Sequence, residues 1–247
     1  MEKNIKVKVR NLTKKFGDLL VLNDVSFDIM EGEILCVVGP TGCGKTTFLN
    51  SLTKLYDITS GEILLNGAPV DLKKNNIAYI FQENSTMPWL TVEQNVRFGL
   101  DIKMRSKAEA DASVNEVLQI VGLTPFRKSY PSQLSASMLQ RVVIARAFAT
   151  KPELLLMDEP YAQLDIELRY KLEDELVRLQ ERTGTTVVFI THNVEEAVYL
   201  GERIMVLTNK PTKVKEIIEN PLPRPRDIAD DAFVALRNHV TDAIKWW

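Results

Sequence analysis

Short apolar runs and longer helical repeats alternate along the chain. Runs typical of buried strands cover residues 34–38, 77–80, 154–157 and 185–191. Apolar residues recur at helical spacing at Phe48, Leu49, Leu52 and Leu55, and then over 108–121, 138–149 and 166–182. This alternation predicts an α/β fold.

The first thirty residues follow a different pattern, in which short β-type runs are separated by turn residues. The runs cover 5–9, 19–22 and 25–29, with Gly17-Asp18 and Asn23-Asp24 between them. They predict an antiparallel sheet. Residues 61–65 add a strand that ends in an Asn66-Gly67 hairpin turn. Closing strands are predicted at 204–207 and 214–218.

Between residues 91 and 150 the β character vanishes, which predicts an inserted α-helical subdomain. Ser135 is the expected N-cap of its last helix. After residue 220 the chain changes again: residues 221–226 predict an extended Pro/Arg linker, and a helical stripe follows at Phe233, Leu236, Val240, Ile244 and Trp247. The stripe either docks on the domain or touches a membrane, and its polar face, which is not rich in Lys and Arg, favours docking. The predicted division is therefore 1–220 and 221–247.

Composition narrows the class of protein. The 247 residues carry a formal net charge of -2 and a sequence pI near 5.9, which argues against a nucleic-acid partner. Cys36 and Cys43 lie in a strand and a loop and do not suggest disulfides, so a reducing cytosol is expected. No apolar run is long enough to span a bilayer and residues 1–4 open no signal peptide, so any membrane role should be peripheral.

One stretch carries specific chemistry. Residues 39–46 fit G-x-x-x-x-G-K-[ST] at every defined position, between a buried strand and a helix. Backbone amides of such a loop converge on phosphates, Lys45 should reach the β- and γ-phosphates, and Thr46 should ligate Mg²⁺. The predicted nucleotide contacts of this loop are Gly39, Pro40, Thr41, Gly42, Cys43, Gly44, Lys45, Thr46 and Thr47. The fold class is therefore a P-loop NTPase core with an antiparallel β subdomain and an inserted helical subdomain.

Two carboxylates follow the strand at 154–157. Paired acids at the carboxyl end of a buried strand are costly unless a cation or a reaction uses them. We therefore expect Asp158 to hold Mg²⁺ and Glu159 to orient the attacking water.

Three other residues have two readings each. Phe16 either stacks on a base or anchors a local core. Gln82 either ligates Mg²⁺ or positions water, or it bonds to backbone. His192 either contacts a γ-phosphate or is structural. A fourth feature is the loop with Met87, Trp89 and Leu90, whose apolar cluster around a proline predicts a partner surface.

With these motifs in place, the chain resembles the ATPase subunit of an ABC transporter from about Val7 to Arg226. The resemblance implies adenine stacking by Phe16, a Q-loop at Gln82, which would also ligate Mg²⁺, a D-loop at Asp165 and a switch histidine at His192. It implies ATP and Mg²⁺ as ligands, a second ATPase subunit and membrane permease subunits as partners, and a place on the cytoplasmic face of the membrane. Residues 88–92 and 222–227 are similar to bacterial importers of nitrate, sulfonate, taurine or bicarbonate, which act with a solute-binding protein.

One motif departs from that family. Ser135, Ala136, Ser137 and Met138 stand where the family has Ser-Gly-Gly-Gln/Met, the signature that closes on the partner subunit's γ-phosphate. Tyr161 to Asp165 also has unusual residues, and Asn193 replaces the usual Asp. These changes keep open a second hypothesis, a nucleotide-binding regulatory subunit with weak hydrolysis.

Two further classes are disfavoured. A DNA-repair or translation ATPase would need a coiled-coil insertion or tandem domains, and the chain has neither. A GTPase would need Asn-Lys-x-Asp, but Asn209-Lys210-Pro211 is followed by Thr212. An energy-coupling ATPase for import of a small solute, a small anion or sulfonate-like compound, remains the leading hypothesis.

Overall fold

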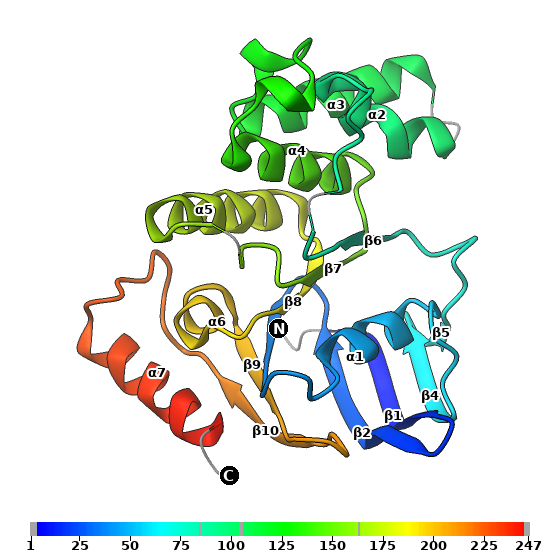
Figure 1. Cartoon of the computed structure of the whole chain (residues 1–247), viewed down its shortest axis with the longest axis vertical. Coiled ribbons are helices and arrows are strands. Elements are labelled where there is room, and N and C mark those ends of the chain that lie inside the picture. The colour runs from blue at the N-terminus through cyan, green and yellow to red at the C-terminus, as the bar shows by residue number, and fades with distance from the viewer. Residues whose placement is uncertain (1–3, 84, 104–105, 163, 245–247) are drawn as a thin grey trace. The chain divides into compact units, whose positions relative to one another are not determined.

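The computed structural model describes residues 4–83, 85–103, 106–162 and 164–244. These form two compact units (Figure 1), one of residues 1–75 with 186–247 and the other of residues 76–185. In the described part of the chain no helix is long and apolar enough to cross a membrane.

The first unit contains the predicted antiparallel sheet. Its strand order is β2-β1-β4-β5, with bounds β1 Ile5–Phe16, β2 Leu19–Met30, β4 Ser60–Leu65 and β5 Ala68–Pro69. The predicted turn at Gly17-Asp18 separates β1 from β2. The predicted turn at Asn23-Asp24 lies inside β2, which runs through both predicted runs with register shifts in its pairing to β1. Asn66 and Gly67 both have left-handed backbones, φ 53° and 76°, as a two-residue hairpin turn requires.

The same unit contains a second group of strands in the order β10-β9-β3-β8. Their bounds are β3 Ile34–Val38, β8 Thr186–Ile190, β9 Arg203–Leu207 and β10 Val214–Glu219. β3 is parallel to β8 and β9, and β10 is antiparallel to β9. Every residue of β3 and β8 is buried, which explains why these strands read as continuous apolar runs.

Three helices complete the first unit: α1 Lys45–Leu52, α6 Val194–Leu200 and α7 Asp231–Ile244. The prediction that helical packing extends to Leu55 is wrong. α1 ends at Leu52, Lys54 is left-handed at φ 55°, and Leu55 is exposed because the chain turns outward there.

The C-terminal helix docks on its own unit. α7 packs on α6 and β9 (Figure 1). It buries Phe233 and Val240. This is the docked alternative of the two that the sequence left open. Trp247, the last residue of the predicted stripe, lies outside the described residues.

The second unit contains a parallel strand pair and the predicted helices. The pair is β6 Ile77–Ile80 with β7 Leu154–Asp158, and the helices are α2 Val92–Ile102, α3 Lys107–Ile120, α4 Ala136–Ala149 and α5 Ile166–Thr183. Capping boxes at Thr91 and Ser106 fix the starts of α2 and α3. The structure thus confirms the α/β class with an antiparallel β subdomain and a helical insertion.

Candidate nucleotide site

The phosphate loop joins β3 to α1 in the first unit. Gly44 is the N-cap of α1 with φ 115° and makes no side-chain cap, and the first turn of α1 holds no acidic residue. The amino end of α1 therefore keeps its positive field, which favours an anion. Thr46 on this turn is exposed and Thr47 is half-buried.

Glycine is required at different positions of this loop by different physical constraints. A Cβ on Gly44 would lie 2.9 Å from Cγ1 of Val21, so a side chain there would force Val21 to shift, and one on Gly39 would meet Leu207 at a tight 3.1 Å. Gly42 has φ 75° but nothing within 4 Å of an added Cβ. Gly42 therefore faces open space, as a residue of a phosphate cradle should.

Lys45 is buried against the loop itself. Its Nζ donates to the carbonyls of Gly39, at 3.1 Å, and Pro40, at 3.3 Å. From the other side the Thr212 hydroxyl donates to the Cys43 carbonyl. Burial raises the pKa of the Cys43 thiol, so it stays protonated and packs as a small apolar group.

Phe16 lies at the end of β1 and is 43% exposed. Its ring meets Tyr56 edge-on at 5.4 Å, and Nζ of Lys14 lies 4.6 Å from its centroid. Such exposure argues against the core-anchor reading. Adenine stacking stays a prediction.

His192 follows β8 and is exposed. Asn193 next to it caps α6 by accepting from the amides of Glu195, at 2.9 Å, and Glu196, at 3.4 Å. Asn and Asp are both strong N-caps, so the departure at Asn193 preserves the local fold.

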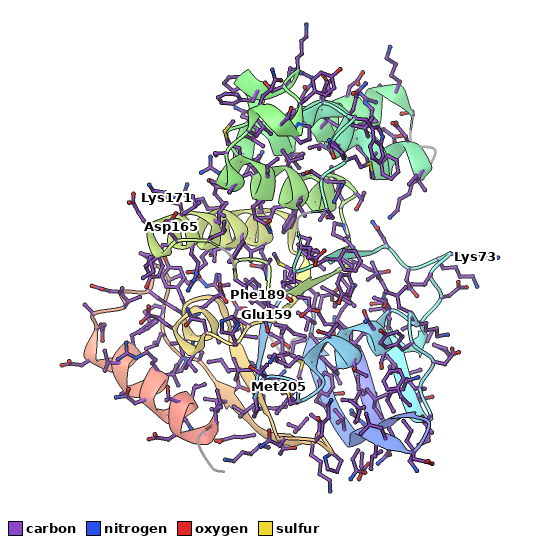
Figure 2. All side chains as sticks on the ribbon, in the orientation of Figure 1. Lys73, Glu159, Asp165, Lys171, Phe189 and Met205 are labelled. Atoms are coloured by element: carbon purple, nitrogen blue, oxygen red, sulfur yellow. The ribbon has the colours of Figure 1, made fainter. Side chains whose placement is uncertain are left out.

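The two acids lie at the end of β7 in the second unit: Asp158 is its last residue, and Glu159 follows it (Figure 2). Asp158 is buried, and Tyr79 donates from its hydroxyl to Oδ2 of Asp158 at 3.4 Å. Glu159 has φ 46°, a left-handed conformation that is uncommon for a non-glycine residue. Gln82, two residues after β6, is exposed.

The segment after Glu159 is built around Tyr161, which the sequence reading did not identify as a core residue. Tyr161 is fully buried, and its hydroxyl donates to the Leu172 carbonyl at 3.3 Å. Asp165 caps α5 by accepting from the Leu168 amide at 2.9 Å (Figure 2). Residue 163 of this segment lies outside the described residues.

The segment that departs from the family signature begins α4. Ser135 is the N-cap, as predicted, and accepts from the amide of Met138 at 3.3 Å. Ala136 is exposed, and Ser137 and Met138 are half-buried. The first turn of α4 therefore presents two side-chain Cβ atoms at the surface.

The loop over residues 87–90 is held by a buried amide that the sequence reading missed. Asn95 of α2 accepts from the Met87 amide at 2.9 Å and donates to the carbonyls of Met87, Leu90 and Thr91 at 3.0–3.1 Å. The sequence feature that could have identified Asn95 is its place as a polar residue on the apolar face of α2. Trp89 on this loop is 72% exposed.

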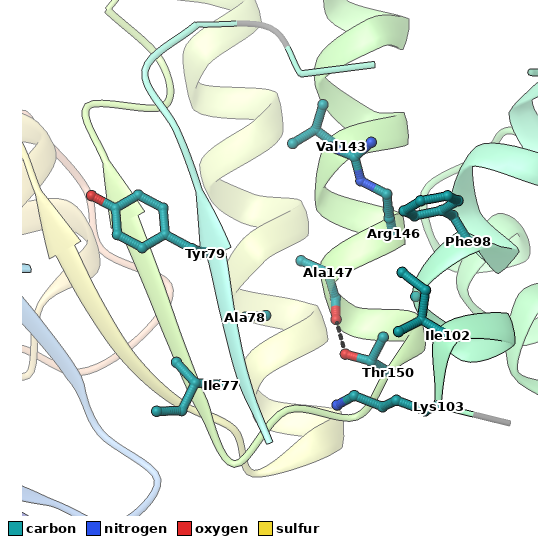
Figure 3. A pocket seen from close by; sticks show the side chains of 11 residues that line it. Ile77, Ala78, Tyr79, Phe98, Ile102, Lys103, Val143, Arg146, Ala147 and Thr150 are labelled. Carbon is teal, nitrogen blue, oxygen red and sulfur yellow. Dashed lines mark hydrogen bonds between the residues drawn. The ribbon is translucent and has the colours of Figure 1, made fainter. Parts of the chain in front are cut away.

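A pocket of about 270 Å³ lies between β6, α2 and α4 (Figure 3). Its apolar wall includes Phe98, Ile102 and Val143. Arg146 lines it and donates to the carbonyl and the hydroxyl of Ser85, at 2.9 and 2.6 Å. The pocket is thus joined to the segment that precedes Trp89.

The donors expected for Mg²⁺ suit a hard cation. The Thr46 hydroxyl, the Gln82 amide oxygen and the Asp158 carboxylate are all oxygen ligands. Thr46 belongs to the first unit with Phe16, the phosphate loop and His192. Gln82 and Asp158 belong to the second unit, with Glu159, Asp165 and the start of α4.

Comparisons with known proteins identify the family of the chain. A family model described as ABC transporter matches residues 22–162. An uncharacterized ABC transporter ATP-binding protein of Methanocaldococcus jannaschii is 42% identical over 98% of this chain and 92% of its own length. An aliphatic sulfonates import ATP-binding protein of Bacillus cereus is 38% identical over 95% of this chain and 92% of its own length.

Solved structures give the same result. CbiO1 of Clostridium perfringens, part of the ABC transporter complex CbiONQ, superposes with a TM-score of 0.80 at 25% identity over 89% of this chain and 90% of that one. A dimeric bacterial ABC transporter cassette gives 0.75 at 33% identity over 88% and 100%, as does its post-hydrolysis state with ADP and Pi. The chain therefore belongs to the ATP-binding subunits of ABC transporters, and it is an ATPase whose ligands are ATP and Mg²⁺.

Proposed function

We propose that this subunit powers the import of a small anionic solute, a sulfonate or a compound like it, through separate membrane subunits. The observation that carries the proposal is the match over nearly the whole chain to a Bacillus cereus subunit for aliphatic sulfonate import. The solute class rests on that likeness, because an ATPase subunit does not itself contact the cargo. A solute-binding protein would take part indirectly.

In this proposal the first unit holds the nucleotide. Residues 39–47 surround the phosphates, Lys45 leaves the carbonyls of Gly39 and Pro40 for the β- and γ-phosphates, and Phe16 stacks on adenine. His192 contacts the γ-phosphate. Phe16 at the end of β1 and His192 after β8 are exposed, so a ligand can reach them.

The second unit supplies the groups for hydrolysis. Thr46, Gln82 and Asp158 would hold Mg²⁺, which when bound neutralises charge on the β- and γ-phosphates. Glu159 accepts a hydrogen bond from the attacking water and orients it. The left-handed backbone at Glu159 supports this role, because such strain concentrates at functional sites.

We propose that the working unit is a dimer of this chain. Ser135, Ala136, Ser137 and Met138 would close on ATP held by the other copy, with Asp165 at the same interface. The dimeric state of the similar ABC cassette supports this arrangement. The amino end of a helix such as α4 favours an anion, which suits a γ-phosphate.

The loop with Met87, Trp89 and Leu90 would bind a cytoplasmic helix of the membrane subunit, so that the ATPase lies on the cytoplasmic face. Trp89 is a large exposed aromatic on a loop that Asn95 fixes by accepting from the Met87 amide and donating to the carbonyls of Met87 and Leu90, and an exposed aromatic on a fixed loop suits an interface anchor. The pocket of Figure 3 offers space for an apolar side chain of the same partner.

A second candidate function is a nucleotide-binding regulatory subunit with weak hydrolysis. The observation that favours it is the start of α4, where Ala136 and Ser137 place Cβ atoms at the position of two glycines. Those atoms would hold the amides of α4 away from the partner's γ-phosphate, and loss of one such donor costs about 10²–10³ in rate.

The test is ATPase activity of the subunit alone and with its membrane subunits, in vesicles. A panel of sulfonates, nitrate and bicarbonate is supplied with the solute-binding protein. Import predicts that one of these anions raises turnover at least tenfold. Slow hydrolysis that neither membrane subunits nor any anion changes would favour the regulatory function instead.

A further inference from the structure

Residues 220–226, which we name the strap, hold the carboxyl end of α6. Arg226 of the strap is buried and donates from Nη1 to the carbonyls of Val198, Tyr199 and Gly201, at 3.0, 2.8 and 2.9 Å. The sequence pattern predicts an extended linker here. The segment forms no helix or strand, but its side chains tie it to the first unit.

Two other strap residues bind the same helix end. Asn220 donates from Nδ2 to two of the same carbonyls at 2.8 and 2.9 Å. Arg224 donates to the carbonyl of Leu200 and forms an ion pair with Glu202 at 2.8 Å. The strap therefore supplies a donor to every carbonyl from residue 198 to residue 201.

A helix like α6 needs such partners. It is seven residues long, which is too short to be stable alone, and the last four carbonyls of any helix have no partner within it. Cationic groups also interact favourably with the partial negative charge at a helix carboxyl end. Arg224 and Arg226 provide both hydrogen bonds and charge.

Arginine is specifically suited to the position at 226. Its Nε donates to Leu222 within the strap at 3.2 Å while Nη1 reaches α6, so one planar group joins the two segments. Burial first, and Arg224 second, lower the pKa of Arg226 to about 10, so it remains charged at neutral pH. Lysine, a single point of charge, cannot bridge both segments.

The other end of α6 begins beside the switch histidine. His192 lies between Thr191 and Asn193, and the Asn193 amide donates to the Thr191 hydroxyl at 2.9 Å. Seven residues span about 10 Å, so a helix fixed at its carboxyl end controls where its first residue lies. Glu202 adds a link to β3 by accepting from the Ile34 amide at 2.5 Å.

We propose that the strap is a positioning device for His192 and acts through α6, with Arg226 as its central residue. This inference rests on the proposed contact of His192 with the γ-phosphate. Without the strap, α6 would fray from its carboxyl end, and the imidazole would spend less time where the phosphate needs it. Misplacement of a group by about 1 Å costs up to 10²-fold in rate.

The chain holds two histidines, which makes the test direct. His239 on α7 is exposed and pairs with Glu216 at 3.4 Å, so His239→Gln leaves His192 as the single imidazole. In this background, Arg226→Lys is compared with its parent by ring NMR signals, kcat and ATP affinity. We expect shifted or broadened ring signals, a kcat lower by about tenfold, and affinity within about twofold.

The matched control is Arg10→Lys. Arg10 lies in the same unit and also donates to two backbone carbonyls, those of Val9 and Phe27, and pairs with Asp28. The Arg10→Lys variant should have lower thermal stability but unchanged His192 ring signals and unchanged kcat. If Arg226→Lys does not fold, Asn220→Ser, which removes two bonds to the same helix end, takes its place.

Unchanged ring signals and kcat in folded strap variants would overturn the proposal, and so would a loss of thermal stability with no change in either. The variant His192→Ala tests the proposed phosphate contact independently of the strap proposal. If that variant keeps full turnover, the phosphate contact is wrong, whereas the ring signals still report whether the strap positions the side chain.

Discussion

Gly42 offers a sharp test of the phosphate cradle, because no packing contact requires a glycine at this position. Its backbone is left-handed at φ 75°, and an added Cβ would meet nothing within 4 Å. Gly42→Ala should therefore fold. Its Cβ would stand in the open space over the loop, where the phosphates are expected.

The cost to folding follows from the backbone. A left-handed conformation costs a residue with a Cβ about 1 kcal/mol relative to glycine, and at this chain length 1 kcal/mol lowers Tm by about 2–4 °C. Gly67 is the matched control, since it has φ 76° and also nothing within 4 Å of an added Cβ. Gly67→Ala should lose the same stability.

The two variants should differ in nucleotide binding. We expect Gly42→Ala to bind Mg-ATP at least tenfold more weakly, a loss of about 1.4 kcal/mol, and Gly67→Ala to bind normally. ATP at 100 times its Kd stabilises a folded protein by about 2.7 kcal/mol, so thermal melts with and without Mg-ATP measure both effects. Equal ATP stabilisation of the two variants would refute the assignment of Gly42 to the cradle.

Three further changes test the other groups. Glu159→Gln should keep ATP affinity, lose at least 100-fold in turnover and accumulate an ATP-bound dimer on gel filtration, and normal turnover would remove Glu159 from its role. Trp89→Ala should leave Tm and basal ATPase activity unchanged, because the side chain is 72% exposed. It should weaken binding to the membrane subunits by about 2 kcal/mol, which would appear as reduced co-purification. A comparable loss of stability would instead place Trp89 in the core. Ala136→Gly with Ser137→Gly should raise kcat about tenfold at constant affinity, and a kcat at or below the parent's would show that Ser137 is itself a working ligand.

The parts of the fold that the sequence predicted are those with a local cause. The unbroken apolar run at β3 indicates a strand that is buried on both faces, and the pair Asn66-Gly67 is typical of a left-handed hairpin turn. Each can be recognised from a few adjacent residues. The phosphate loop was found for the same reason, since its glycines and Lys45 are close in sequence. The N-cap at Ser135, which was predicted, is equally local.

The parts that the sequence did not predict depend on contacts between distant segments. Arg226 bonds to carbonyls about 25–28 residues away, and carbonyls leave no trace in a hydrophobic pattern. Asn95 similarly has a structural role only through its hydrogen bonds to the 87–90 loop. Leu55 failed for the opposite reason: its spacing fits a helix, but the backbone at Lys54 turns the chain away.

Glu159 differs from the other described non-glycine residues with positive φ. Asn11, Asp24 and Asn66 are of the types that tolerate this conformation. Lys54 and Lys151 follow the C-caps of α1 and α4, where a left-handed residue commonly ends a helix.

Neither account applies at Glu159. It follows a strand, it is a glutamate, and Pro160 after it favours an extended backbone rather than φ 46°. A glycine would relieve the strain but would remove the carboxylate. The chain therefore keeps an unfavourable backbone together with a specific side chain, and such strain concentrates at functional sites, which supports our proposal that Glu159 orients the attacking water.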